Sequence, residues 1–413
     1  MQVSGASASV LADGIASHLT YCTNVHPGEQ WAETFEALRR HLPAVKARVS
    51  PSERFGVGLR LSAMAAHQLA EPQALEAFQA FLSEHGLYVF TVNGFPYGAF
   101  HHARVKDQVY LPDWRDPRRS HYTDTLVSLL AQLLPPGCEG SISTVPAAYR
   151  RHIASDADAG MDSLVLQLLR QAASLYRVAV GTGRHIVLAL EPEPSCLLET
   201  SADVVTFFER HLLTRASLAT LAGWVGCDLR FAERVLRAHL GVCLDACHAA
   251  VEFESPLESL ACVEDAGIRI AKVQLSAGLH AHRVDELPPE AFDELADEVY
   301  LHQVVEQRAG EVQLVRYEDL PQALSTCSKG GRGQAARDWR IHFHVPVWCR
   351  ELGVFGTTQP FLQSWLARHR VRPIAQHLEV ETYTWHVLPP AWRTMALDEA
   401  IAHELNWVRE QLS

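Results

Sequence analysis

Residues 241–253 read GVCLDACHAAVEF, an apolar run that contains one acid. Asp245 stands at the end of the run, and His248 follows it three residues later. The residues before Asp245 are typical of a buried strand, where an unpaired carboxylate is costly. Asp245 therefore needs either a compensating partner or a functional role.

Similar apolar runs recur along the chain, and they alternate with segments whose apolar residues follow a helical period. The strand candidates are residues 18–24, 56–62, 87–95, 140–146, 185–194, 240–248, 268–278, 340–348 and 377–385. Regular alternation of this kind predicts a parallel sheet covered by helices. About eight strand–helix repeats favour an α/β fold of one domain, a (β/α)8 TIM barrel over residues 1–413, closed by a helix at Leu397–Leu412.

Nine strand candidates exceed the eight places in such a barrel, so one of them must belong to an insertion before the last strand. We expect the insertion at residues 279–340, as a hairpin around Ala309 and Gly310 followed by a glycine-rich loop. The apolar pattern alone does not show which of the nine strand candidates lies outside the barrel.

A long loop at residues 93–117 follows the third strand candidate. Long loops in compact domains are often lids over an active site, and a surface excursion is the alternative. If the loop is a lid, it brings three aromatic side chains toward the ligand: Tyr97, Phe100 and Trp114.

The composition limits the partners and the compartment. The chain has 48 acidic and 36 basic residues, a net charge of −12, which disfavours binding to nucleic acids. Nine cysteines, an odd number with no Cys-x-x-Cys pair, indicate reduced thiols. The sequence shows neither a signal-peptide pattern nor an apolar run long enough for a membrane span, so we expect a cytoplasmic protein.

Polar side chains gather at the ends of five strand candidates. They are Glu191 and Glu193, Asp245 and His248, Lys272 and Gln274, His342 and His344, and Glu379 and Glu381. Strand residues two apart share a face, and active sites of TIM barrels lie at the carboxyl ends of the strands. We therefore expect these groups to meet in one polar centre.

Three acids in such a centre would repel each other and take up protons unless a cation joined them. We expect a divalent metal ion held by Glu191, Asp245 and Glu381, with Gln274 or His344 as the fourth ligand. Oxygen ligands favour Mn²⁺, Mg²⁺ or Co²⁺, and an added imidazole favours Zn²⁺. The alternative is that Lys272, Arg60 and the histidines balance the acids without any metal.

At these residues the chain resembles the xylose isomerase-like barrel superfamily, which includes sugar-phosphate isomerases, epimerases and endonuclease IV. The shared pattern is Glu on strand five, Asp-x-x-His on strand six, His or Gln on strand seven and Glu on strand eight. The matching segments are ALEPEP with Glu191, LDACH with Asp245 and His248, KVQLSAG with Gln274, and VETYTW with Glu381. The long interval from Gln274 to Glu381 departs from the pattern and fits the expected insertion.

More narrowly, four segments resemble the EboE group of that superfamily, described as metabolite traffic proteins. They are HLTYCTNVHPGEQW, FGVGLRLS, VFTVNGFPYGAFH and HFHVPVW. The resemblance covers nearly the whole chain. It implies a small-molecule metabolite as ligand and a membrane protein, similar to prenyltransferases, as a partner.

The superfamily resemblance implies a metal-dependent isomerase or epimerase of a sugar, sugar phosphate or cyclitol. The metal would stabilise an enediolate, Glu191 and Glu381 would move the proton, and His248 would bind a substrate oxygen. Lys272, or Arg60, would neutralise an anionic group of the substrate. Two alternatives are a non-catalytic protein that binds and carries a metabolite, and an endonuclease IV-like phosphodiesterase, which the acidic charge disfavours.

Overall fold

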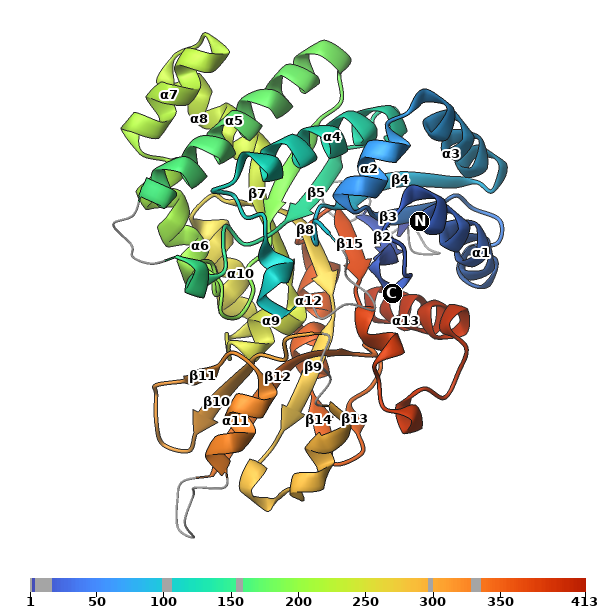
Figure 1. Ribbon diagram of the computed structural model, residues 1–413, viewed down its shortest axis with the longest axis vertical. Helices are drawn as coiled ribbons and strands as arrows, with labels where there is room; N and C mark the ends of the chain where they lie inside the picture. The colour runs from blue at the N-terminus through green and yellow to red at the C-terminus, as the bar shows by residue number, and fades with distance from the viewer. Residues whose placement is uncertain (1, 4–16, 99–105, 154–158, 296–299, 328–335) are drawn as a thin grey trace.

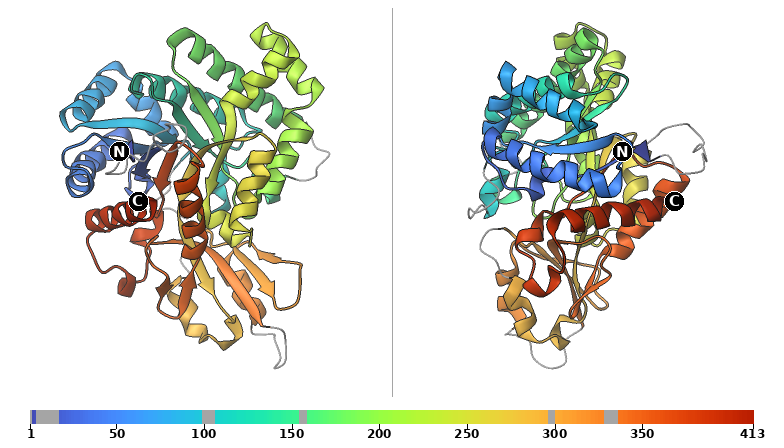
Figure 2. Two further views of the ribbon diagram at one scale, coloured as in Figure 1. Left: turned by 180° about the vertical axis from the view of Figure 1, so that it is seen from behind. Right: turned by 90° about the vertical axis from the view of Figure 1, so that its right-hand side faces the viewer.

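The structure of the protein is a computed structural model, which describes residues 2–3, 17–98, 106–153, 159–295, 300–327 and 336–413. Within these ranges the chain forms two sheets, a parallel ring and a smaller antiparallel sheet beside it (Figure 1). The antiparallel sheet projects from one end of the ring, as the side view also shows (Figure 2).

The ring is a nearly closed barrel of parallel strands with helices outside, which confirms the expected (β/α)8 fold. Its hydrogen-bonded order is β2, β15, β8, β7, β6, β5, β4 and β3, and a parallel bridge from Cys22 to Gly58 joins the two ends. The short β1 (Gln2–Val3) adds to β2 in the antiparallel direction. The barrel strands are β2 (Ser17–Tyr21), β3 (Phe55–Arg60), β4 (Leu87–Asn93), β5 (Gly140–Thr144), β6 (Ile186–Leu190), β7 (Leu240–Asp245), β8 (Arg269–Leu275) and β15 (His377–Val380).

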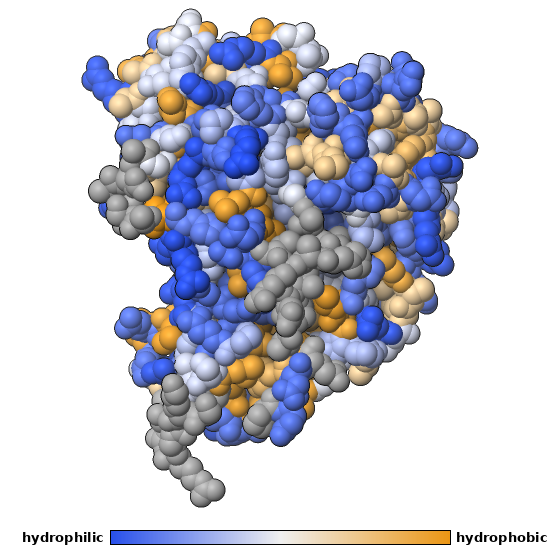
Figure 3. Space-filling view, viewed as in Figure 1, coloured by the Kyte–Doolittle hydropathy of each residue, from blue (hydrophilic) through white to orange (hydrophobic). Residues whose placement is uncertain are grey.

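The barrel strands are apolar along most of their length because parallel strands are covered on both faces. The covering helices bury one apolar side and expose the other to solvent. The helices of the chain are α1 (Trp31–Val49), α2 (Ala63–Leu69), α3 (Pro72–Glu84), α4 (Pro117–Leu133), α5 (Ala159–Thr182), α6 (Ser201–Phe207), α7 (Arg215–Val225), α8 (Leu229–His239), α9 (Ala246–Val251), α10 (Pro256–Asp265), α11 (Leu320–Cys327), α12 (Gln359–Val371) and α13 (Leu397–Leu412). Figure 3 shows one face of the molecular surface, where hydrophilic residues surround small groups of hydrophobic residues.

The antiparallel sheet lies between β8 and β15 in the sequence, so it is the insertion before the last barrel strand. Its order is β11, β10, β12, β9, β14 and β13. The strands are β9 (Ala277–Ala281), β10 (Val304–Arg308), β11 (Val315–Tyr317), β12 (Arg337–Val345), β13 (Glu351–Leu352) and β14 (Phe355–Thr357). The expected segment, residues 279–340, lies within this region, which continues to Thr357.

Two details of the insertion answer questions that the sequence left open. β10 and β11 pair in the antiparallel direction on either side of Ala309 and Gly310, so a hairpin forms there. The surplus strand candidate, residues 340–348, overlaps β12, which pairs with β9 and β10 rather than with a barrel strand. β12 carries His342 and His344, so both histidines come from the insertion.

The last helix, α13, packs against α1 and α12 and buries Ile401, Leu405 and Val408. It also buries an acid, Glu404, which is 1% exposed. Glu404 accepts hydrogen bonds from the Thr382 hydroxyl at 2.6 Å and from the Val347 backbone N–H at 3.2 Å. Burial nevertheless raises the pKa of Glu404 to about 7.

This raised pKa predicts a pH-dependent stability. The folded state favours the protonated form of Glu404. The stability that this side chain contributes is therefore fully present below its unfolded pKa, near 4.5, and is lost as the pH rises through about 7. Glu404→Gln keeps a hydrogen-bond acceptor and cannot ionise. Urea denaturation measures the free energy of unfolding of the variant and of wild type at each pH. We expect the difference, variant minus wild type, to increase by about 3 kcal/mol between pH 4 and pH 8.5. A difference that does not change with pH would contradict the prediction.

Candidate functional site

A cavity opens where the carboxyl ends of the barrel strands meet the insertion. The barrel contributes Asn24, Glu191, Glu193 and Glu381 to its lining, and β12 contributes His342. The cavity thus lies where active sites of TIM barrels are found, between two parts of the chain that are distant in sequence.

Three carboxylates meet in this region. Glu191 directly follows β6, Asp245 is the last residue of β7, and Glu381 directly follows β15. One oxygen of each lies within 4.8 Å of the others. The structure therefore brings together the three acids that the sequence places at strand ends.

The Asp245 carboxylate is held on one side only. Its Oδ1 accepts hydrogen bonds from the Ser276 hydroxyl at 2.6 Å and from the His248 backbone N–H at 2.9 Å. Its Oδ2 is buried and has no hydrogen-bond partner among the described residues. Burial opposes ionisation, but His248, His344 and the Ser276 hydrogen bond outweigh it and keep the pKa of Asp245 below its usual value.

The other two acids resist ionisation. Burial, together with the charge of Asp245, raises the pKa of Glu191 to about 7, although His248 opposes the shift. Burial and the neighbouring Glu191 and Asp245 carboxylates raise the pKa of Glu381 well above its usual value. Asn24 donates a hydrogen bond of 2.8 Å to Glu381, which offsets little of this repulsion. A cation at this position would favour the ionised forms.

His344 reaches the same place from β12. Its Nδ1 lies 2.6 Å from the backbone carbonyl of Glu381, which can only accept, so Nδ1 carries the proton. Its Nε2 is buried and has no partner among the described residues. A ring nitrogen of His344 lies within 4.8 Å of ligand atoms of Asp245 and His248. Burial lowers the pKa of His344 to about 4.

His248 and His342 lie beside this group. The Nε2 atoms of the two rings are 3.1 Å apart. An oxygen of Glu193 lies within 4.8 Å of a ring nitrogen of each histidine, and Glu193 Oε1 is 3.8 Å from His342 Nδ1. Burial opposes protonation of His248, but Asp245, Glu193 and Glu191 raise its pKa above the usual value. Burial and the two neighbouring imidazoles, those of His248 and His344, lower the pKa of His342.

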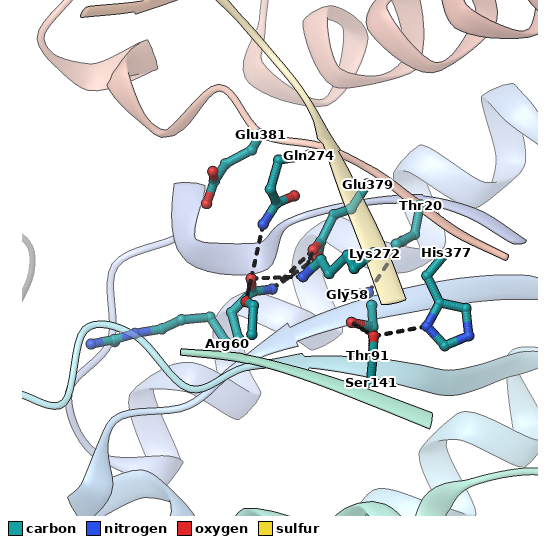
Figure 4. A network of polar contacts seen from close by, with 12 residues as sticks. Thr20, Gly58, Arg60, Thr91, Ser141, Lys272, Gln274, His377, Glu379 and Glu381 are labelled. Atoms are coloured by element: carbon teal, nitrogen blue, oxygen red, sulfur yellow. Dashed lines mark hydrogen bonds and ion pairs between the residues drawn. The ribbon is translucent and has the colours of Figure 1, made fainter. Parts of the chain in front are cut away.

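Lys272, Gln274 and Glu379 form a separate polar cluster inside the barrel (Figure 4). Lys272 forms an ion pair with Glu379, and both side chains are 0% exposed. Lys272 Nζ also donates to Asn93 Oδ1 at 2.8 Å. The Gln274 amide lies 3.1 Å from Asn93 and 3.2 Å from Glu379. None of the three residues of this cluster lines the cavity, whereas their partner Asn93 does.

Two of the three aromatic residues named from the loop at residues 93–117, Tyr97 and Trp114, do not line the cavity. Trp114 is 0% exposed, and Tyr97 packs edge-on against Tyr122. Phe100 lies outside the described residues. Among the described residues of this loop, the aromatic rings that line the cavity are those of Phe95 and Tyr110.

Several site residues had no part in the sequence prediction. Asn24 and Asn93 stand at the ends of strand candidates, so the rule that identified the acids would also have selected them. Ser276, which binds Asp245, follows β8 directly in the same way. Gln303 precedes β10 in an irregular segment and Tyr110 ends a short 3-10 helix (Lys106–Tyr110), and neither carries a periodic signal in the sequence.

The described helices include none that combines the length and the apolar character needed to cross a membrane. This observation concerns the described residues alone.

No protein-family model matches the sequence, and no curated protein matches it either. Solved structures show low similarity. The probable 3-DHS dehydratase AsbF of Bacillus anthracis, involved in petrobactin synthesis, is 12% identical, with a TM-score of 0.42 over 94% of this chain and 97% of that one. The IolI protein with a bound zinc atom is 11% identical, with a TM-score of 0.41 over 96% and 98% of the two chains.

A xylose isomerase-like TIM-barrel protein from Mycobacterium smegmatis, in complex with magnesium, is 10% identical. Its TM-score is 0.49, over 96% of each chain. Similarity at this level carries no conclusion about the metal, substrate or reaction of this chain, which must be argued from its own residues.

Proposed function

We propose that the protein is a metal-dependent isomerase or epimerase that acts on a sugar, sugar phosphate or cyclitol by proton transfer beside a carbonyl. One observation carries the proposal: Glu191, Asp245 and Glu381 converge within 4.8 Å, and Asp245 Oδ2 and His344 Nε2 have no partner among the described residues. Buried charged groups must be paired or must coordinate a metal.

The donor set fits a divalent transition ion. Glu191, Asp245 and Glu381 would hold it through oxygen, and His344 would supply the fourth ligand through Nε2. The hydrogen bond from His344 Nδ1 to a carbonyl is the usual second contact of a metal-binding histidine. His344 suits this role better than Gln274, whose amide contacts Asn93 and Glu379. Three oxygens and one imidazole suit Mn²⁺, Co²⁺ or Zn²⁺.

The bound ion would supply a Lewis acid for the substrate carbonyl. The residues of the chain would move the proton: Glu191 and Glu381 leave different barrel strands, β6 and β15, so they approach a substrate in the cavity from two directions. One would take the proton from carbon, and the other would return it. The aromatic rings of Phe95 and Tyr110 would shield this step from water.

Membership of the EboE group is a further part of the proposal. Its support is the resemblance of four segments, one of which, HFHVPVW, lies on β12 and its end and contains both His342 and His344. A membrane-protein partner and a role in carrying a metabolite would follow from that membership. Metal binding without turnover would favour the carrier over the enzyme.

The first test measures the metal. Wild type purified without chelator and supplied with Mn²⁺, Co²⁺ or Zn²⁺ should retain stoichiometric ion in elemental analysis. Asp245→Asn should lose the ion held by the three carboxylates, and with it the stabilisation against heat that this ion provides. Glu404→Gln is the matched control, because it neutralises a buried acid outside the cavity and should keep the metal. Wild type without bound metal would contradict the proposal.

The second test measures the chemistry. Aldoses, ketoses, their phosphates and keto-cyclitols are incubated with the metal-loaded protein in D₂O, and exchange at the carbon next to the carbonyl is followed by proton NMR. Exchange of at least one compound, absent with Asp245→Asn, is the expected result. Metal-loaded protein that exchanges none of them would leave a binding or carrier role.

A further inference from the structure

We propose a second metal position in the same cavity, held by Glu193, His248 and His342 beside the position of the proposed function, on which this inference rests. The second position uses none of the four ligands of the first. Ligand atoms of its three residues lie within 4.8 Å of one another.

The hydrogen bonds of Gln303 fix the His342 ring. Gln303 Nε2 donates to the Tyr110 hydroxyl at 3.0 Å and lies 3.3 Å from the carbonyl of Pro194, which can only accept. Gln303 Oε1 therefore faces His342 Nδ1, 2.8 Å away, and accepts a hydrogen bond from the Nδ1–H group. On this assignment the Nε2 of neutral His342 carries a lone pair.

His248 is fixed in the same way from the other side. Its Nδ1 lies 2.8 Å from the carbonyl of Pro192, so Nδ1 carries the proton and the Nε2 of the neutral ring carries a lone pair. The Nε2 atoms of His248 and His342 then face each other at 3.1 Å as two acceptors. Such a contact is repulsive, and a cation between or beside the two nitrogens removes the repulsion.

Glu193 completes a ligand set of two imidazoles and one carboxylate. Its side chain is buried, and its Oε1 accepts a hydrogen bond of 2.7 Å from Tyr110. Two histidines and one glutamate with an open fourth position form a known zinc arrangement. Each ligand also has the outer hydrogen bond that orients metal ligands: His248 to a carbonyl, His342 to an amide oxygen and Glu193 to a hydroxyl.

The charge of the cavity also favours two ions over one. Four carboxylates line or adjoin it: Glu191, Glu193, Asp245 and Glu381. The fifth acid of the region, Glu379, is neutralised by Lys272. One divalent ion would compensate half of the charge of four ionised acids, whereas two would compensate all of it.

The competing explanation is a proton in place of the metal. An imidazolium at His248 could donate from Nε2 to the lone pair of His342, and the nearby acids would stabilise it. A proton satisfies the two nitrogens but adds only one positive charge to the cavity. The two explanations differ in the number of metal ions that the protein binds.

The test counts ions in tag-free full-length protein carrying His282→Gln. This change disables a separate surface group of potential ligands, His280, His282 and Asp338, without altering the cavity. After removal of metals with a chelator, Co²⁺ is titrated and followed by visible absorption and elemental analysis. We expect two ions per chain, the second with the intense absorption of a tetrahedral histidine site.

Adding His342→Gln should reduce the count from two to one and remove that absorption. Glu193→Gln should do the same and serves as the second variant if His342→Gln fails to fold, which circular dichroism will show. One ion in the His282→Gln protein, unchanged by either variant, would overturn the second position and leave the proposed function standing. No bound ion at all would overturn both.

Discussion

Replacing Lys272 by methionine is expected to lower the free energy of unfolding by about 3–5 kcal/mol. Lys272 and Glu379 form an ion pair in which both side chains are 0% exposed. Burial opposes the charge on Lys272, but Glu379 outweighs it and raises the pKa of the lysine above its usual value. Methionine has a similar length and no charge, so Glu379 would be left buried without its counter-ion.

The double variant Lys272→Met with Glu379→Gln is the matched control. It removes both charges and keeps an acceptor for Asn93, which donates to Glu379 Oε1 at 2.9 Å. We expect it to recover most of the lost stability in urea denaturation, because replacing a buried ion pair as a unit costs far less than breaking it. A loss below about 1 kcal/mol in the single variant would contradict the prediction.

The same pair of variants decides between two roles for Lys272. The sequence allowed a lysine that neutralises an anionic substrate or one that forms a structural ion pair. If the role is structural, the double variant should bind metal and exchange substrate protons as wild type does. Gly58 adds to the structural argument, because a Cβ there would collide with the Glu379 carboxylate.

The barrel could be predicted from the sequence because its signal is local. Each unit consists of an apolar strand followed by an amphipathic helix, and neighbouring units pair with each other. The insertion was harder to assign. β12 reads as a buried strand in the sequence, and only its distant partners, β9 and β10, show that it lies outside the barrel.

The sequence predicts which side chains of the candidate site share a face of their strand, but not how deep in the barrel each side chain lies. Glu379 and Glu381 are two residues apart and therefore share a face, as do Lys272 and Gln274. Glu379 nevertheless pairs with Lys272 inside the barrel, whereas Glu381 lies at the cavity. Depth depends on how the strands are staggered around the ring, which a single sequence does not reveal.

Replacing Glu191 by glutamine is expected to slow proton exchange by about 10²–10⁴-fold, the range typical for loss of a general acid or base. Glutamine keeps the shape of the side chain and an oxygen for the metal, but it cannot take up a proton at neutral pH. The measurement uses a compound that wild type exchanges in D₂O, at saturating Mn²⁺, with metal content determined on the same samples.

Glu191 would both move the proton and bind the metal. The control must therefore separate the loss of a general base from the loss of a metal ligand. His344→Gln supplies that control: His344 would bind the metal through Nε2 but has no part in moving the proton. With excess Mn²⁺ restoring the ion, we expect His344→Gln to recover most of the exchange rate and Glu191→Gln to remain slow despite full metal occupancy. Equal recovery of both variants would show that Glu191 serves the metal alone, and the proton would then have to move through Glu381.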